Sequence, residues 1–184
     1  MKKRPIFIQD KMLLERKWAM PNKNTFTIKP INELLKEEIN HGEWLDPFAN
    51  DFDFSIFRGC FTTNDINPEF NTDYNLDALD FLKEFDNDSI DGVLYDPPYS
   101  PRQVSECYKQ FGKDITMETT QSSFWSHHKN EIARITKPGG KVICFGWNSM
   151  GCGINRGFDM KRVLLVPHGG HHNDTIITVE IKRI

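Results

Sequence analysis

Four adjacent residues, Asp96-Pro97-Pro98-Tyr99, have side chains and a backbone that could activate a weakly nucleophilic amine. They follow the apolar run Val93-Leu94-Tyr95, which predicts a buried strand ending at the aspartate. In an open parallel sheet, ligands bind beyond the carboxyl ends of the strands. Proline donates no backbone hydrogen bond and holds φ at about −65°, so we expect free carbonyl acceptors in a stiff loop.

The exocyclic amine of a nucleic-acid base is a substrate that fits these groups. Its lone pair is delocalised into the ring, which makes the nitrogen a poor nucleophile. A carboxylate and a backbone carbonyl that accept from its two N–H groups would favour a tetrahedral, nucleophilic nitrogen. A tyrosine ring that stacks on the base contributes about 1–3 kcal/mol, and alignment with a methyl donor supplies much of the rate. An ordinary Asp-Pro turn is the alternative, but the complete pattern after a buried strand favours methyl transfer.

The rest of the chain predicts an α/β protein that holds this loop at a sheet edge. Strands alternate with helices, which indicates a largely parallel sheet, and the last two strands follow one another as an antiparallel hairpin with a turn at 167–173. Residues 1–25 are predicted to be an arm with turns, and Lys137-Pro138-Gly139-Gly140 is a predicted breaker. Helices are expected at 30–39, 76–85, 101–111 and 120–136, and strands at 60–63, 91–95, 141–147, 162–166 and 175–181.

The motif Asp96-Pro97-Pro98-Tyr99 resembles that of amino-methyltransferases acting on N6 of adenine or N4 of cytosine in DNA. An initial aspartate is more typical of the adenine enzymes, serine of the cytosine enzymes, and asparagine of RNA and protein-glutamine methylases. Segments 137–140, 145–149 and 172–176 are similar to those of small phage-encoded adenine methylases. The resemblance implies a Rossmann-like three-layer αβα methyltransferase fold, S-adenosylmethionine as cofactor and adenine N6 in DNA as target.

Two upstream segments resemble the cofactor motifs of that family. Asp46-Pro47-Phe48 resembles the start of the cofactor loop, which here continues Ala49-Asn50 where the family has glycines. Asp65 lies 19 residues after Asp46, close to the roughly 20 expected for an acid that binds ribose hydroxyls one βα unit later. The resemblance therefore assigns Asp46, Pro47, Phe48, Ala49, Asn50, Asp65 and Asn67 to the cofactor site.

Two further segments extend the predicted cofactor site. Asp77-Ala78 resembles the motif in which an aspartate meets the cofactor adenine, although Asp77 could equally cap a helix. Lys17-Trp18 resembles part of the N-terminal motif of adenine methylases related to Dam, with Trp18 as a core residue the alternative. We thus expect a basic arm, 1–30, that contributes to the cofactor site, followed by a single catalytic domain, 31–184.

Composition and charge restrict the class of protein. The 184 residues are 38% apolar and 27% charged, as in a globular domain. No apolar run reaches the roughly 18 residues of a membrane helix, so we expect no membrane association and a cytoplasmic location in a bacterial or phage-infected cell. Net charge is +6 over residues 1–29, −14 over 37–96 and +5 over 101–184, so a polyanion would be attracted to the ends of the sequence and repelled by its middle.

Cysteine and histidine patterns do not predict a metal site. The four cysteines are far apart and form no C-x-x-C pair, as expected of reduced, mostly buried thiols. His168, His171 and His172 are interpreted as a turn at the sheet rim that could lie near DNA phosphate. Methyl transfer from a sulfonium needs no metal.

The chain has little room for a target-recognition region. Only 18 residues separate Asp77 from Asp96, and Ser100 to Ser123, with Arg102, Gln103, Lys109, Gln110, Lys113 and Thr116, is the one sizeable candidate near the motif. Sequence reading is therefore expected to be limited, shared in a homodimer, or supplied by a DNA-recognition partner. Duplex and single-stranded DNA both remain open. Alternatives are an N4-cytosine or RNA base methyltransferase, and a non-catalytic protein that binds cofactor or DNA.

Overall fold

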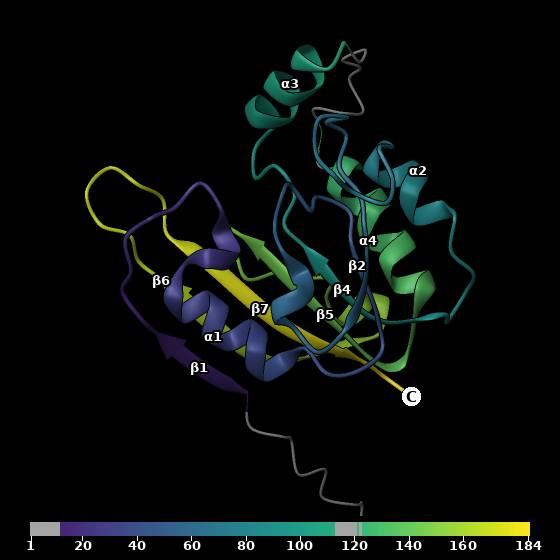
Figure 1. Cartoon of the computed structure of the whole chain (residues 1–184). Coiled ribbons are helices and arrows are strands. Elements are labelled where there is room, and N and C mark those ends of the chain that lie inside the picture. Colours follow the sequence, from purple (N-terminus) through teal and green to yellow (C-terminus); the bar gives the residue numbers. More distant parts are fainter. Residues whose placement is uncertain (1–11, 113–120, 122) are drawn as a thin grey trace, which may run out of the picture.

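A computed structural model describes residues 12–112, 121 and 123–184, which fold around a seven-stranded sheet of order β1-β6-β7-β5-β4-β2-β3 (Figure 1). Neighbouring strands run parallel except where β7 pairs with β5 and β6. The strands are β1 (Leu13–Arg16), β2 (Glu43–Asp46), β3 (Cys60–Thr63), β4 (Ile90–Tyr95), β5 (Thr136–Gly146), β6 (Phe158–Val166) and β7 (Thr175–Lys182). The helices are α1 (Lys29–Glu38), α2 (Ala78–Lys83), α3 (Pro101–Gln110) and α4 (Ser123–Ile135), with short 3-10 turns η1 (Thr25–Thr27), η2 (Phe54–Ile56) and η4 (Ile154–Arg156).

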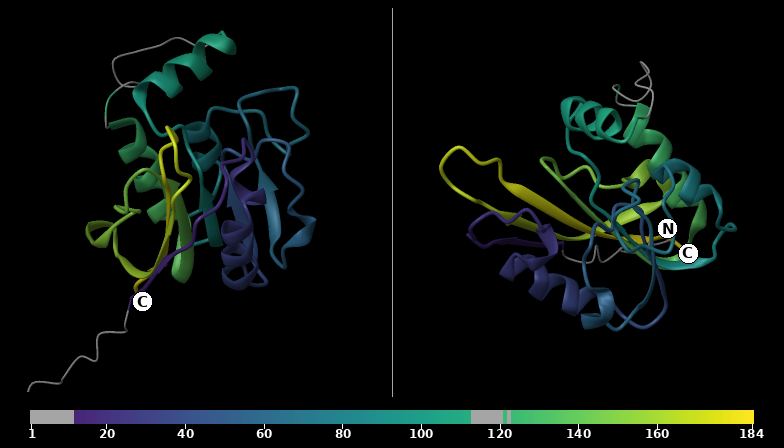
Figure 2. Two further views of the ribbon diagram at one scale, coloured as in Figure 1. Left: turned by 90° about the vertical axis from the view of Figure 1, so that its left-hand side faces the viewer. Right: turned by 45° about the horizontal axis from the view of Figure 1, so that its top comes forward.

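Helices cover both faces of the sheet, which gives three layers (Figure 2). Alternate residues of a strand point to opposite faces. In β4, Leu94 packs with α1 on one face, whereas Val93 and Tyr95 pack with α2 and α4 on the other. The predicted Rossmann-like αβα fold, mostly parallel with a C-terminal antiparallel hairpin, is confirmed.

The position of β2 beside β4 brings the predicted site residues to one edge. Trp44 of β2 lies against two glycines: a Cβ on Gly92 or Gly59 would meet its ring at 2.5 or 2.4 Å. The Trp44 ring can therefore lie over these two positions only because both lack a side chain. β2 and β4 run parallel, so Asp46 and Asp96 follow at the same edge of the sheet.

The N-terminal segment differs from the prediction. Residues 13–16, expected to belong to an irregular arm, form β1, an edge strand parallel to β6. Four residues are too few to show a strand period, and Leu13 and Leu14 are both exposed, so no alternation of apolar and polar residues marked the strand. The prediction of turns was therefore wrong here, while residues 1–11 lie outside the described part of the chain.

The predicted breaker at 137–140 is a bulge within β5. Thr136 pairs with Ile90 and Lys141 with Gly92, so four residues of β5 are accommodated against a single residue of β4. Gly139 has φ +81°, a conformation that favours glycine. In the described part of the chain, no helix is both long and apolar enough to cross a membrane.

Candidate active site

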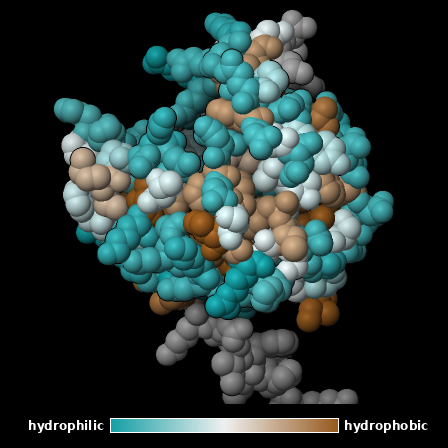
Figure 3. All heavy atoms as spheres, in the orientation of Figure 1, coloured by the Kyte–Doolittle hydropathy of each residue, from teal (hydrophilic) through white to brown (hydrophobic). Residues whose placement is uncertain are grey.

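A cavity of about 420 Å³, here called the acidic cavity, lies beyond the carboxyl ends of β2, β3 and β4. It is within the range typical of small-molecule sites. The predicted site residues that line the acidic cavity are Pro47, Phe48, Asn50, Asp65, Asn67, Asp77, Ala78, Asp96, Pro97, Pro98 and Tyr99; no Lys or Arg among the described residues lines it. Figure 3 shows that the surface below α3, on the face that carries α1, is recessed.

Asp96 and Tyr99 form one hydrogen-bonded unit at the end of β4. The Tyr99 hydroxyl donates to Asp96 Oδ1. Burial raises the pKa of the Asp96 carboxyl to about 6, and hydrogen bonds from the side chains of Tyr99 and Thr25 partly oppose that shift. Desolvation and the neighbouring carboxylate raise the pKa of the Tyr99 hydroxyl, which remains a proton donor.

The two prolines of the loop differ in their backbone contacts. The Pro98 carbonyl accepts a hydrogen bond from Trp125 Nε1 of α4 at 2.8 Å. The expectation that both proline carbonyls are free was therefore wrong for Pro98, because an indole from a distant helix reaches it. Among the described residues, none donates a hydrogen bond to the Pro97 carbonyl, which lies in the lining of the acidic cavity.

Asp46 is fully buried at the end of β2. Its Oδ1 accepts from the Phe48 amide at 2.8 Å, whereas Oδ2 has no hydrogen-bond partner among the described residues. Burial, together with the charges of Asp96 and Asp65, raises the pKa of the Asp46 carboxyl well above its ordinary value. An unpartnered buried carboxylate oxygen is costly, and a nearby cation would offset that cost.

Asp65 joins the loop after β2 to the loop after β3. Its Oδ2 accepts from the Asn50 amide at 3.0 Å, and its Oδ1 accepts from the Asn67 amide at 2.9 Å. Asn50 has φ +58°, the left-handed conformation that asparagine tolerates better than most residues. Asn50 thus adopts the conformation that a glycine would adopt in this loop. Each Asp65 oxygen keeps a second lone pair for a ligand.

Asp77 both caps α2 and lines the acidic cavity. Its two interpretations from the sequence, as a helix cap and as a cofactor-site residue, are therefore compatible. Its Oδ1 accepts from the Leu79 amide at 3.0 Å, and its Oδ2 accepts from the Tyr108 hydroxyl of α3. Ala78 follows in the cavity wall. Tyr108 fixes α3 over the cavity, a contact that sequence reasoning missed because the two residues are 31 apart in the sequence.

Lys17 and Trp18 do not lie with the other predicted cofactor residues. Trp18 is 62% exposed, and Lys17 pairs with Glu15 at 3.3 Å. Neither lines the acidic cavity, because they continue from edge strand β1 on the far side of the sheet. The described arm reaches the cavity through Thr25 instead. Ala49 is buried behind the lining, where its amide donates to the Asn64 carbonyl.

Asn64, another residue that sequence reasoning missed, braces the loops around the cavity. It is fully buried. Its side-chain amide donates to the carbonyls of Pro47 and Leu76, and its Oδ1 accepts from the Leu76 amide at 2.9 Å. The sequence gives only one sign of this role: Asn64 is a polar residue between the end of β3 and Asp65.

A second cavity of about 590 Å³, here called the aromatic cavity, lies on the other side of the Asp96–Tyr99 loop. Pro97 and Tyr99 line both cavities. The remaining wall comes from β4, the start of α3, α4, β5 and the segment 147–156. It includes Tyr95, Trp125, Lys129, Phe145, Trp147 and Arg156, and no Asp or Glu among the described residues.

The histidine-rich turn borders a third hollow, of about 330 Å³, which shares Tyr99 and Trp147 with the aromatic cavity. His168 is buried: its Nδ1 lies 2.9 Å from the Ala19 carbonyl and its Nε2 2.8 Å from Thr175 Oγ1. These contacts hold the N-terminal segment against the β6–β7 hairpin. Lys113 and Thr116, predicted recognition residues, lie outside the described residues.

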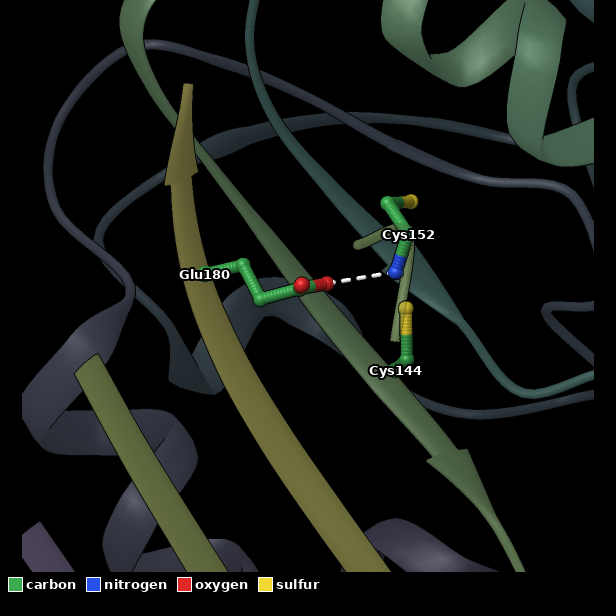
Figure 4. Close-up of side chains that lie close together, drawn as sticks. All are labelled: Cys144, Cys152 and Glu180. Carbon is green, nitrogen blue, oxygen red and sulfur yellow. Dashed lines mark hydrogen bonds between the residues drawn. The ribbon is translucent and has the colours of Figure 1, made fainter. Parts of the chain in front are cut away.

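Cys144, Cys152 and Glu180 gather behind the aromatic cavity, with ligand-type atoms within 4.8 Å of one another (Figure 4). Glu180 uses both carboxylate oxygens to accept backbone amides, from Cys152 at 2.6 Å and Gly153 at 3.0 Å. A side-chain hydrogen bond with Cys144, together with burial, raises the pKa of the Cys152 thiol well above its ordinary value. The carboxylate therefore anchors the segment after β5, and the two cysteine side chains lie beside it.

Comparison with known proteins identifies the fold. No family model matches the sequence, and no curated protein matches it. A 1,6-didemethyltoxoflavin-N1-methyltransferase from Burkholderia thailandensis, solved with S-adenosylhomocysteine, aligns at TM-score 0.57 and 12% identity over 85% of this chain and 78% of that one. The Escherichia coli protein yhhF aligns at 0.53 and 10%, over 85% and 84%. TrmN from Thermus thermophilus aligns at 0.53 and 14%, over 84% and 49%. The chain has the Rossmann-like fold of methyltransferases.

Proposed function

We propose that the protein transfers a methyl group from S-adenosylmethionine to N6 of adenine in DNA. The observation that carries this proposal is the junction of the acidic cavity with the Asp96–Tyr99 loop. The cavity supplies carboxylates for a cationic donor, and the loop supplies acceptors for an amine at the same edge of the sheet.

The acidic cavity fits the charge of the donor. S-adenosylmethionine carries a sulfonium, an ammonium and a carboxylate, so its net charge is positive. The cavity is lined by Asp65, Asp77 and Asp96 without a Lys or Arg among the described residues. Asp46, at the end of β2, adds a buried carboxylate oxygen that has no hydrogen-bond partner among the described residues. A bound cation would stabilise these acids in their charged form.

Individual residues are suited to parts of the donor. The free lone pairs of Asp65 would accept from ribose hydroxyls, as in related βα-loop sites. Asp77 and Ala78, beneath Tyr108, would hold the adenine, and Phe48 supplies an apolar wall. When bound, the donor supplies an electrophilic methyl group on sulfur.

The chain's own residues prepare the amine. The Asp96 carboxylate and the free Pro97 carbonyl would accept hydrogen bonds from the two N–H groups of adenine N6, and the Tyr99 ring would stack on the base. After transfer the nitrogen is positively charged and must lose a proton. Asp96, with its pKa near 6, is a suitable acceptor at neutral pH.

Identification of the methylated product tests the proposal. Protein is incubated with donor carrying a labelled methyl group and with DNA, and the DNA is digested to nucleosides. We expect the label in N6-methyldeoxyadenosine. Label in N4-methylcytosine would contradict the adenine assignment, and labelled RNA beside unlabelled DNA would contradict the DNA assignment.

Donor binding tests the alternative of a non-catalytic protein. Calorimetry should detect binding of S-adenosylmethionine to the wild-type chain. Absence of donor binding, together with no label transfer above background in either the wild type or Asp96→Ala, would favour a protein that binds without catalysis. The glycine-like conformation of Asn50 argues for a functional cofactor loop.

A further inference from the structure

We infer that the aromatic cavity binds the acceptor strand of DNA, and that Lys129 contacts a phosphate next to the methylated nucleotide. This inference rests on the proposed function, because it names the site for the second substrate of that reaction. Three features of the cavity support it: its position, its walls and its charge.

The position follows from the shared loop. Pro97 and Tyr99 line both the acidic and the aromatic cavity. A strand whose target base reaches Asp96 therefore runs past the mouth of the aromatic cavity, and the nucleotides on either side of the target are the nearest occupants.

The walls are flat and rigid. Trp147 packs against Tyr99 with ring centroids 5.7 Å apart at 70°, and Trp147 is 42% exposed. Trp125 is held in place by its hydrogen bond to the Pro98 carbonyl. Exposed aromatic faces bind unpaired bases with little regard to sequence, which suits a protein with little room for a recognition region.

The charge is suited to an anion. Lys129 forms no ion pair within 4 Å with any described carboxylate; its charge acts on buried Glu180 only at longer range. Arg156 is held by the neutral acceptors Asn130 Oδ1 at 2.7 Å, Ser126 Oγ at 2.8 Å and the Cys152 carbonyl at 3.1 Å. Two cations without an acid in the described lining favour phosphate.

Aromatic faces and cations together identify a nucleotide strand rather than a free anion. A base inside a duplex must leave its stack to reach such a site, at a cost of a few kcal/mol that an unpaired strand avoids. A short single-stranded oligonucleotide is therefore the probe of choice.

The test compares Lys129→Gln with a control variant, Lys36→Gln. Lys36 belongs to α1 and does not line the aromatic cavity. Binding of a fluorescein-labelled single-stranded 12-mer with one adenine is measured by anisotropy at several salt concentrations, and donor binding by calorimetry. For Lys129→Gln we expect about fivefold weaker oligonucleotide binding and a salt slope smaller by about 0.7, the contribution of one phosphate contact on a single strand. Donor affinity and the melting temperature should not change.

A second variant, Trp147→Ala, tests the contribution of the aromatic wall to oligonucleotide binding. Trp147→Ala should weaken oligonucleotide binding about five- to tenfold with the salt slope unchanged, because stacking carries no charge. Wild-type affinity and salt slope in both variants would overturn the inference. If the wild-type protein methylates no DNA but Lys129→Gln still lowers DNA affinity and salt slope, the proposed reaction fails while the strand site stands.

Discussion

The acidic cavity and the aromatic cavity share a loop but differ in every charged group that lines them. One has three aspartates and no described Lys or Arg; the other has Lys129 and Arg156 and no described Asp or Glu. A cationic donor and an anionic strand would thus be bound on opposite sides of Asp96 to Tyr99. The difference shows how one short loop can serve two substrates of opposite charge.

The order of elements in the sheet explains this separation. The acids follow β2, β3 and β4, within the segment 37–96 of net charge −14, whereas Lys129 and Arg156 belong to the segment 101–184 of net charge +5. β4 lies between β2 and β5, so the motif at its end falls where the acidic and basic segments meet. A protein with an overall charge of −3 can therefore still have a locally basic site.

The largest effect should come from the group between the cavities. Asp96→Ala removes the acceptor of the amine, and we expect the transfer rate to fall by about 10²–10⁴-fold while the donor dissociation constant changes less than about threefold. Label transfer and calorimetry measure the two quantities. Asp86→Ala, an exposed acid after α2, is the control. Transfer within a factor of two of wild type in Asp96→Ala would contradict the assignment.

Removal of an acid from the donor side should separate the two cavities. Asp65→Asn loses one charged acceptor, worth about 1.5–3 kcal/mol, so the donor dissociation constant should rise about tenfold or more with oligonucleotide affinity unchanged. Asp73→Asn is a matched control, since Asp73 also accepts hydrogen bonds beside β3, from the Thr63 amide and hydroxyl, but lies outside the cavity. Equal effects of both variants on donor binding would count against Asp65 as a donor contact.

The pH dependence of methyl transfer should reflect the ionisation of Asp96. Asp96 with a pKa of about 6 is largely protonated at pH 5, so the transfer rate should rise about tenfold between pH 5 and pH 7.5. A rate without this rise in wild type would show that ionised Asp96 is not required.

The stability of the ligand-free protein should change in the opposite sense. Because the folded pKa of Asp96 lies above its ordinary value of 3.8, the folded state binds this proton more tightly than the unfolded state. The free energy of unfolding should therefore decrease as pH rises from about 4 to about 6. Asp96→Asn should remove this part of the decrease, which denaturant titrations at both pH values would detect; an identical pH dependence in the variant would exclude the shift.

A smaller effect is expected where α4 supports the shared loop. Trp125→Phe removes the hydrogen bond to the Pro98 carbonyl, worth about 0.5–1.5 kcal/mol. The transfer rate should fall about two- to tenfold with donor affinity retained. An unchanged rate, with the fold intact by circular dichroism, would indicate that this bond does not position the loop.

The smallest effect should come from Trp18, which lies outside both cavities. Trp18→Ala should leave the donor dissociation constant within about twofold of wild type. A tenfold loss of donor affinity would instead support the prediction that Lys17-Trp18 is a cofactor motif.

Much of the fold was predictable because it depends on local patterns. The apolar run at 91–95 and the helical spacing at 30–39 identified β4 and α1 to within a residue or two. β1 was missed because its four residues bury little and depend on pairing with β6. Residues 137–140 were predicted to interrupt regular structure, because proline and glycine usually end a strand. In the structure β5 continues through them as a bulge.

The site was predictable where residues lie at strand ends and less so where contacts are long-range. Asp46, Asp65 and Asp96 follow strands of one parallel sheet, so topology brings them to one edge. The Tyr108–Asp77 and Trp125–Pro98 hydrogen bonds join residues 31 and 27 apart, and no spacing rule indicates them. The absence of an ion pair between Lys129 and any described carboxylate likewise depends on long-range folding, which no spacing in the sequence indicates.

The most direct test of the two-cavity arrangement is a crystal structure with S-adenosylhomocysteine and a single-stranded oligonucleotide containing adenine. We expect the cofactor product between Asp65 and Asp77, an adenine amine at Asp96, and a phosphate beside Lys129. Cofactor product bound in the aromatic cavity, or an oligonucleotide that leaves Tyr99 and Lys129 without contact, would contradict the arrangement.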